Sequence, residues 1–300
     1  MAWQGSLSLD YRLDEVHGAP RSVVRDRHDG PLRVLASLYP EAAQVCHNVL
    51  VHPPGGLVGG DRLDIAVTLA PGAHALITTP GATRFYRSTG ATATQQLNAT
   101  LADGARLEWL PLETLAYSGC LAENAMRFEL SPGAEMIGWD VLALGLPASD
   151  RAFVHGRFEQ RIELPGRWLE RGVIDAADTR LLDSPLGWDG QRVMGTLWFA
   201  AGAALPTERR EALLDAARAA VAAVAAAATA PAPATDPASP AAEGLRPVHA
   251  GATAVHDGIV VLRVLGPRVE PVMALLARAW ALWRDTAWQL PACTPRVWRT

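Results

Sequence analysis

Lysine is absent from this sequence, so all 27 of its basic residues are arginine. Without a lysine amine, the chain cannot form a Schiff base or build a Walker A loop, whose lysine contacts the nucleotide phosphates. A P-loop NTPase is therefore excluded. An excess of positive charge is absent too, because 31 acidic residues bring the net charge to −4. Bulk electrostatic binding of nucleic acid needs a basic surface, so we expect no nucleic-acid partner.

Cysteine is scarce and long apolar runs are missing. Cys46, Cys120 and Cys293 are far apart and form no CxxC pair, which argues against a disulfide framework or a four-cysteine zinc site and fits a reducing compartment. The longest apolar run, Ala219–Ala228, is mostly alanine and too short to cross a bilayer. The first residues lack the basic and apolar segments of a secretory signal. We therefore expect a soluble, cytoplasmic protein with no membrane partner.

Most of the first two hundred residues alternate between apolar and polar side chains. The period of two is clear in Arg62–Leu69, Met126–Leu130 and Phe158–Leu164, and such a pattern is typical of strands that bury one face. Frequent Gly and Pro pairs separate these segments. The pattern predicts a mainly β protein, which could be a sandwich, a barrel or a stacked-sheet solenoid.

Two helices are predicted in the C-terminal third. The first begins at Thr207 and continues through an alanine-rich stretch to about Thr229, and the second runs from about Val269 to Ala287 with apolar residues at helical spacing. A strand is predicted at Ile259–Leu265. Between the first helix and this strand, residues 230–244 are rich in Ala and Pro and are expected to form a flexible linker within the domain.

The most unusual segment is His52–Asp64, which reads HPPGGLVGGDRLD. Its four glycines allow positive φ angles and the close approach of another backbone or a ligand. The spacing differs from GxGxxG, and a strand rather than a helix follows, so the helix N-terminus of a phosphate cradle is missing. A tight irregular turn explains the four glycines, Gly55, Gly56, Gly59 and Gly60, as well as a functional loop does.

Asp61 and Asp64 are the candidate cation-binding residues of this segment. Three residues apart on a strand, they point to opposite faces, and a surface position is the better interpretation for Asp64. No HExxH or paired Cys–His zinc pattern occurs in the sequence. A metal-dependent hydrolase that uses Asp61 with His47 or His52 stays open as an alternative.

A second unusual segment, Thr78–Ser88, places two arginines beside two aromatic residues. Arg84, Tyr86 and Arg87 form a possible docking surface for an anion or a protein partner. Solvated arginines on a strand edge explain the segment equally well. No GxSxG motif surrounds a serine, so an α/β-hydrolase is not indicated.

These segments resemble the UreD (UreH) family of urease accessory proteins over nearly the whole chain. The resemblance rests on Tyr39-Pro40-Glu41, Cys46-His47, His52–Asp61, Thr78–Ser88, Leu107–Pro111 with Glu113, Leu181–Pro185 and Pro295–Thr300. It implies one UreD-like domain over residues 1–300, with a β-helix-like stack of sheets and a few helices.

The resemblance also implies a function without catalysis. Members of the family take part in the maturation of the nickel enzyme urease by docking on apo-urease. They bind UreF, which recruits the GTPase UreG, and the complex is a two-fold assembly formed through UreF. It is thought to relay Ni²⁺ through an internal passage, with no tightly bound cofactor. By motif position, Asp61, Asp64 and Glu170 are the expected low-affinity passage residues. In a third interpretation the chain is a pure interaction module, and Asp61 only shapes the glycine turn.

Overall fold

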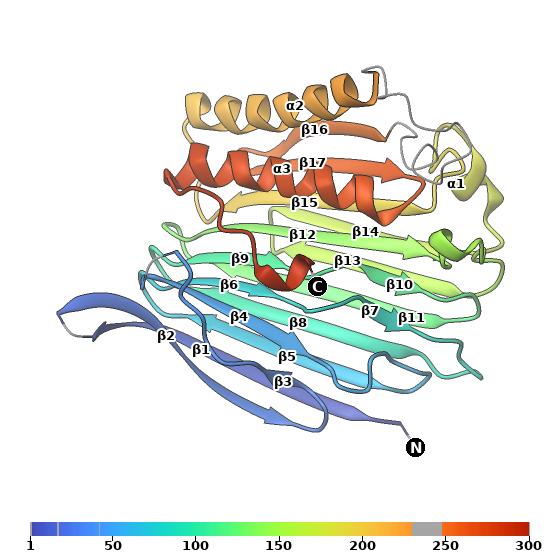
Figure 1. Cartoon of the computed structure of the whole chain (residues 1–300), viewed down its shortest axis with the longest axis horizontal. Coiled ribbons are helices and arrows are strands. Elements are labelled where there is room, and N and C mark those ends of the chain that lie inside the picture. Colours follow the sequence, from blue (N-terminus) through green and yellow to red (C-terminus); the bar gives the residue numbers. More distant parts are fainter. Residues whose placement is uncertain (1, 17, 42, 230–247, 300) are drawn as a thin grey trace.

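Two facing β-sheets and a layer of helices make up the molecule (Figure 1). The computed structural model describes residues 2–16, 18–41, 43–229 and 248–299, without the side chains of residues 227–229. The mainly β prediction is confirmed, and the stacked-sheet solenoid is the variant that the chain adopts.

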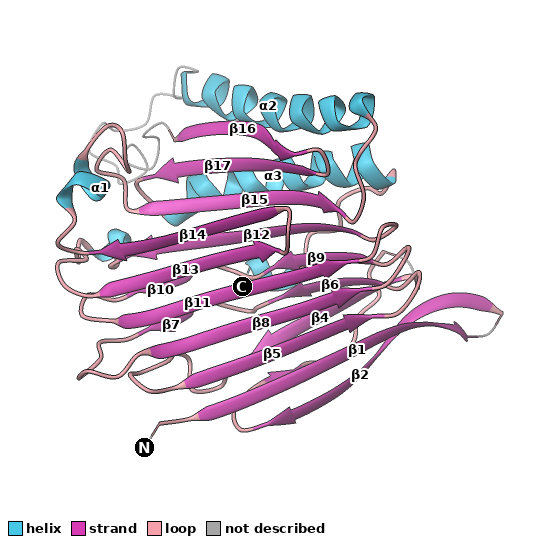
Figure 2. Cartoon of the chain, turned by 180° about the vertical axis from the view of Figure 1, so that it is seen from behind, coloured by secondary structure: helices cyan, strands magenta, loops and turns pink. Residues whose placement is uncertain are grey.

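The first sheet has seven strands, and its central strands are parallel. In spatial order they are β14 (Trp168–Asp175), β13 (Arg157–Leu164), β11 (Leu121–Leu130), β8 (Ala93–Leu101), β5 (Arg62–Leu69), β1 (Gln4–Val16) and β2 (Ala19–Asp29). The β1–β2 hairpin extends beyond the other strands at one end of the sheet (Figure 2).

The second sheet has ten strands. Eight follow in the order β16 (His249–His256), β17 (Ile259–Gly266), β15 (Val193–Ala201), β12 (Glu135–Leu144), β9 (Arg106–Leu110), β6 (His74–Thr78), β4 (Val45–Val51) and β3 (Arg33–Val34). The short strand β10 (Thr114–Ala116) pairs with β12 and with β7 (Thr83–Phe85).

The chain winds as a coil between the two sheets. From β4 to β13, successive long strands alternate between the sheets, and from β5 onward each pairs in parallel with the strand one coil earlier. Turns at the coil corners use glycine with positive φ, as at Gly72 (71°) and Gly104 (69°). Because the strands are parallel and in register, equivalent positions of successive coils lie side by side in the interior.

Two apolar clusters explain two different sequence patterns. The first fills the space between the sheets, and the second lies between the ten-stranded sheet and the helices. The outer face of the seven-stranded sheet is polar and exposed, so a strand such as β5 alternates strictly. Strand β12 is buried on both faces, since Met136 packs in the first cluster while Ile137 and Trp139 pack in the second. Its sequence is therefore a nearly continuous apolar run.

Two long helices cover the outer face of the ten-stranded sheet (Figure 1). They are α2 (Thr207–Thr229) and α3 (Val269–Trp288), close to the predicted bounds, and β17 matches the predicted strand. A short helix that was not predicted, α1 (Thr179–Asp183), begins where Asp178 accepts a hydrogen bond from the Leu181 amide at 3.0 Å. The predicted linker 230–244 lies outside the described residues. No helix among the described residues is long and apolar enough to cross a membrane.

The C-terminal segment returns over the ten-stranded sheet after α3 (Figure 1). It ends in the 3₁₀ helix η3 (Arg296–Arg299), and another, η1 (Pro147–Ser149), follows β12. Trp298 packs against Trp139 and Trp280 at ring-centroid distances of 5.0 and 5.6 Å, and its indole N–H donates to Thr78 Oγ1 at 2.8 Å. This anchor fixes the end of the chain to both the sheet and α3.

Candidate functional site

The two unusual sequence segments meet in space. Leu57, in the centre of the glycine-rich turn, donates its amide to Arg84 O at 2.7 Å and accepts the Tyr86 amide at 2.8 Å. These bonds join the turn to β7 as a short parallel bridge. Segments about 30 positions apart in sequence therefore form one structural unit.

The four glycines of the turn serve two purposes. Gly55 and Gly60 have φ of 78° and 91°, in the left-handed region where other residues are strained. Gly56 and Gly59 are needed for space, because a Cβ atom at these positions would lie 2.9 Å from Arg84 O and 2.7 Å from Ala91 O. The turn is thus a close-packed structural element between strands.

Asp61 closes this turn. Its buried carboxylate accepts the Trp3 amide on Oδ1 at 2.7 Å and the Val58 amide on Oδ2 at 2.8 Å. One side chain therefore ties the start of β1 to the glycine-rich turn. Both oxygens are used for structure here, which supports the interpretation that Asp61 shapes the turn.

Asp64 and Glu170 lie in different surroundings from Asp61. Asp64 lies on the exposed face of β5, where both its oxygens pair with Arg62, at 2.8 and 3.0 Å. Glu170 lies on the inner face of β14, and its carboxylate pairs with Arg263 of β17, across the space between the sheets. The three predicted passage residues therefore do not form one site.

A row of amide side chains crosses the inner face of the seven-stranded sheet. Gln95, Asn124 and Gln160 are direct register partners on β8, β11 and β13. Gln95 Nε2 donates to Asn124 Oδ1 at 3.3 Å, and Asn124 Nδ2 lies 3.5 Å from Gln160 Oε1. Their strand neighbours on the same face, such as Phe158 and Ile162, are buried and apolar. The row is therefore a polar layer within an apolar core.

A second polar row faces the first from the ten-stranded sheet. Asp140, Thr196 and Arg263 are register partners on β12, β15 and β17. Asn124 Nδ2 donates to Asp140 Oδ1 at 3.2 Å, and the Arg263–Glu170 pair joins the sheets at the other end. We call these residues, Gln95, Asn124, Gln160, Asp140, Thr196, Arg263 and Glu170, the polar lane. It extends from β8 to the edge strand β14.

Asp140 is the most perturbed acid of the polar lane. Burial raises the pKa of its carboxyl from an ordinary value of 3.8 to about 7, and the negative charge of Glu170 acts in the same direction. The neighbouring side chains of Gln160 and Asn124 oppose both effects, and Asn124 does so through its hydrogen bond to Oδ1. A pKa of about 7 means that the protonated and ionised forms of this carboxyl are similarly populated near neutral pH.

The sequence analysis found Glu170 but missed the rest of the polar lane. A signal was present, because Asn124, Gln160 and Arg263 occupy inward positions of otherwise apolar alternation. A polar side chain at a buried strand position needs a partner, so it marks a polar contact in the core. Which strands supply the partners follows only from the coil register.

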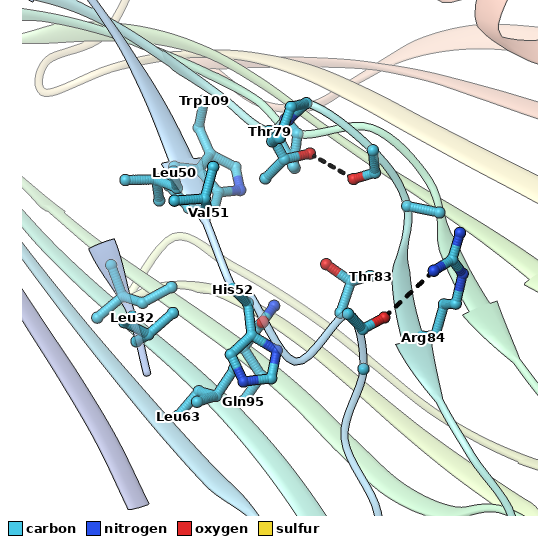
Figure 3. Close-up of a pocket in the computed structure, with 17 residues that line it drawn as sticks. Leu32, Leu50, Val51, His52, Leu63, Thr79, Thr83, Arg84, Gln95 and Trp109 are labelled. Atoms are coloured by element: carbon cyan, nitrogen blue, oxygen red, sulfur yellow. Dashed lines mark hydrogen bonds between the residues drawn. The ribbon is translucent and has the colours of Figure 1, made fainter. Parts of the chain in front are cut away.

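A cavity of about 240 Å³ adjoins the polar lane at Gln95 (Figure 3). The glycine-rich turn and the segment from Thr79 to Arg84 form one side of it, and the apolar side chains of Leu63 and Trp109 form part of the other. His52 lies in its lining, and burial lowers the pKa of this imidazole, against the raising effect of the nearby Asp61 charge. The other docking candidates are Tyr86, which stacks edge-on with Tyr117, and the exposed Arg87.

His47 belongs to a buried ionic cluster beneath α3. His47 Nε2 lies 2.7 Å from Glu41 Oε1, and Arg284 Nη2 donates to Glu41 Oε2 at 2.5 Å. On the other side of Arg284, the Glu108 carboxylate lies 2.9 Å from His74 Nε2. Burial alone would raise the pKa of Glu41, but the bonds from His47 and Arg284 outweigh it and lower that pKa. The cluster holds α3 to the sheet, and the sequence analysis did not predict it.

No group of three or more His, Cys, Asp or Glu side chains in the described part of the chain is arranged to hold a metal ion. The carboxylates described above are engaged in separate places, with backbone amides, arginines, an amide side chain or, for Glu41 and Glu108, a histidine. They do not converge on one point.

Comparison with known proteins agrees with these motifs. The family model described as UreD urease accessory protein matches residues 4–299. A urease accessory protein UreD from Leptothrix cholodnii is 57% identical over 300 residues, covering 100% of both chains. Those from Paracidovorax citrulli and Variovorax paradoxus are 58% and 56% identical, over 99% and 100% of both chains. On this evidence, the chain belongs to the UreD family of urease accessory proteins.

Proposed function

We propose that this chain is a non-catalytic scaffold that docks on apo-urease, binds UreF and through it UreG, and relays Ni²⁺ toward the urease active site in the cytoplasm. Membership of the family supports the role in urease maturation. The partners, the two-fold assembly through UreF and the nickel relay go beyond that membership and form the proposal itself.

The observation that carries the relay is the polar lane. It is a row of carboxylate, amide and hydroxyl oxygens, with one guanidinium, that of Arg263 on Glu170, within a core that is otherwise apolar. Burying polar groups costs free energy unless they are partnered, so folding alone would favour apolar residues at these positions. Isolated oxygen ligands bind Ni²⁺ more weakly than a closed cage of His and Cys, which suits a metal that has to be released again.

The hydrolase alternative receives less support. His47 is held by Glu41, and both oxygens of Asp61 accept backbone amides. A catalytic metal site needs side chains that converge on the metal and leave a position for substrate. His52 keeps a free imidazole in the cavity, but its partner in that hypothesis, Asp61, is already engaged.

The test is urease activation by variants of the polar lane. Asp140→Asn and Glu170→Gln remove one carboxylate each from the lane, and Glu129→Gln removes an exposed carboxylate of β11 as the matched control. At equal yield of the complex with UreF, UreG and urease, we expect the first two to lower nickel incorporation several-fold and the control to leave it unchanged. Full activation by both lane variants would refute the relay.

Asp61→Ala separates the relay from the interaction module. The substitution leaves the Trp3 and Val58 amides without their carboxylate acceptor, and we expect it to cost about 2–4 kcal/mol of unfolding free energy. If Asp61 also relays nickel, nickel delivery falls even where the complex is recovered in equal yield. Normal delivery at equal yield would restrict Asp61 to its structural role. Co-purification with UreF and UreG tests the scaffold role directly. If the chain binds neither partner, the scaffold role is contradicted.

A further inference from the structure

The cavity beside the glycine-rich turn has chemistry that the nickel relay does not use. Most of its lining is apolar, with polar groups gathered at a few positions (Figure 3). The apolar part comprises Leu32, Leu50, Val51, Leu63, Ile65, Trp109 and Pro111. Ligand sites commonly combine an apolar wall with a few polar groups that fix the orientation of the ligand.

Arg84 supplies the guanidinium in the lining of this cavity, as the one arginine among its described lining residues. Its only hydrogen bond to the described residues is a long one, from Nη1 to Gly55 O at 3.4 Å, and no carboxylate of the described chain pairs with it. Some arginines of the described chain pair with a carboxylate, such as Arg171 with Glu159 at 2.7 Å and Arg263 with Glu170. Others do not, such as Arg167, which donates to the backbone carbonyls of Ala201 and Gly202. Arg84 therefore keeps most of its donors available.

The charge of the cavity favours an anion over a cation. No Asp or Glu lines it. Burial lowers the pKa of His52, so this imidazole is neutral near pH 7. Asp61 influences His52 electrostatically, but its oxygens accept the Trp3 and Val58 amides. The lining thus carries one positive charge. This charge repels a metal ion, and a ligand with a single negative charge would balance it.

The shape and chemistry of the cavity narrow the class of anion. A guanidinium presents its donors as a planar fork that matches a carboxylate. The hydroxyls of Thr79 and Thr83 lie in the same lining. A volume of about 240 Å³ is just below the usual range for ligand pockets, so a short group fills it. We propose that this cavity binds a monocarboxylate that carries a short apolar group, with the carboxylate on Arg84 and the apolar group against Leu63 and Trp109.

Two sources share this chemistry: a small free acid and the C-terminal residue of a partner polypeptide. Three probes separate them in ligand-observed NMR titrations of the full chain. N-acetyl-L-leucine represents a chain terminus, 4-methylpentanoate is the same apolar acid without the peptide unit, and N-acetyl-L-leucinamide lacks the charge. We expect saturable binding of the acids with a Kd of order 1 mM or tighter. Clearly tighter binding of N-acetyl-L-leucine indicates a chain terminus, and equal binding indicates a free acid.

Variants assign the binding to the cavity. Because charge-assisted hydrogen bonds are lost, we expect Arg84→Gln to weaken binding of the acids about 10- to 100-fold, and Arg84→Lys, which keeps the charge without the fork, to weaken it less. Arg27→Gln, at an exposed arginine of β2 outside the cavity, is the matched control and leaves the Kd unchanged.

Three results would overturn the proposal. They are the absence of saturable binding by the unmodified chain, equal binding of the amide and the acid, and an unchanged Kd in folded Arg84→Gln. The comparison of acid with amide needs no variant, so it holds even if a substitution at Arg84 disturbs folding. None of these measurements depends on urease or nickel, so failure here is distinct from failure of the relay.

Discussion

Replacement of Asp140 by Asn is expected to stabilise the protein at high pH and to leave its stability nearly unchanged at low pH. Asp140 is buried between the sheets, and its pKa is about 7 in the folded chain against 3.8 ordinarily. Between these two values the folded state holds a proton that the unfolded state has released. Stability therefore falls as pH rises from about 4 to about 7, because the folded state binds more protons over that interval.

The size of the effect follows from the two pKa values. At about 1.36 kcal/mol for each pKa unit, the change from 3.8 to about 7 corresponds to about 4 kcal/mol at and above pH 8. Asn has the shape of a protonated Asp and still accepts the hydrogen bond from Asn124, so it avoids this cost at every pH. The gain of Asp140→Asn should grow from about zero near pH 4 to as much as about 4 kcal/mol near pH 8.

Guanidinium chloride unfolding, followed by tryptophan fluorescence at several pH values, measures this difference directly. Contributions from other titrating groups are common to both proteins and cancel in the comparison. Asp64→Asn, on the exposed face of the seven-stranded sheet, is the control and should show no such trend. The reasoning would be refuted if the difference in unfolding free energy between Asp140→Asn and the parent chain were the same near pH 5 and near pH 8. It would also be refuted if the parent chain were the more stable of the two near pH 8.

Two further predictions concern buried groups. Arg284→Met leaves the carboxylates of Glu41 and Glu108 buried without the arginine side chain. We therefore expect the unfolding free energy, measured with guanidinium chloride, to fall by about 3–5 kcal/mol. A fall of less than about 1 kcal/mol would show that the cluster does not hold α3. Burial raises the pKa of Cys120 to about 12, so iodoacetamide near pH 8 should label the half-buried Cys293 well before Cys120. Peptide mass spectrometry would detect equal labelling, which contradicts that order.

The period-two pattern predicted one sheet better than the other. The strands whose alternation is clear in the sequence, such as Arg62–Leu69 and Phe158–Leu164, all belong to the seven-stranded sheet, which has one wet face. Central strands of the ten-stranded sheet, such as β12, are covered on the far side too, so polar residues do not alternate along them. Continuous burial removes the signal on which strand prediction depends.

The polar lane could be predicted only in part from the sequence. Asn124 and Gln160 could have been recognised as polar residues at inward strand positions, 36 residues apart. Nothing local in the chain says that they are register partners, or that Asp140 of the opposite sheet bonds to Asn124. Those relations come from the pitch of the coil, which depends on how all the strands pack together.

The sequence by itself determined the β class, both long C-terminal helices and the glycine-rich turn, because each depends on local periodicity or on backbone freedom at single residues. Its motifs also indicated the family. Only the tertiary structure decided that the turn bonds to Arg84 beside a cavity, that Asp61 is bound to amides of Trp3 and Val58, and that the polar lane joins two sheets. These features are contacts between residues distant in sequence, and they follow from the winding and register of the coil and from no local pattern.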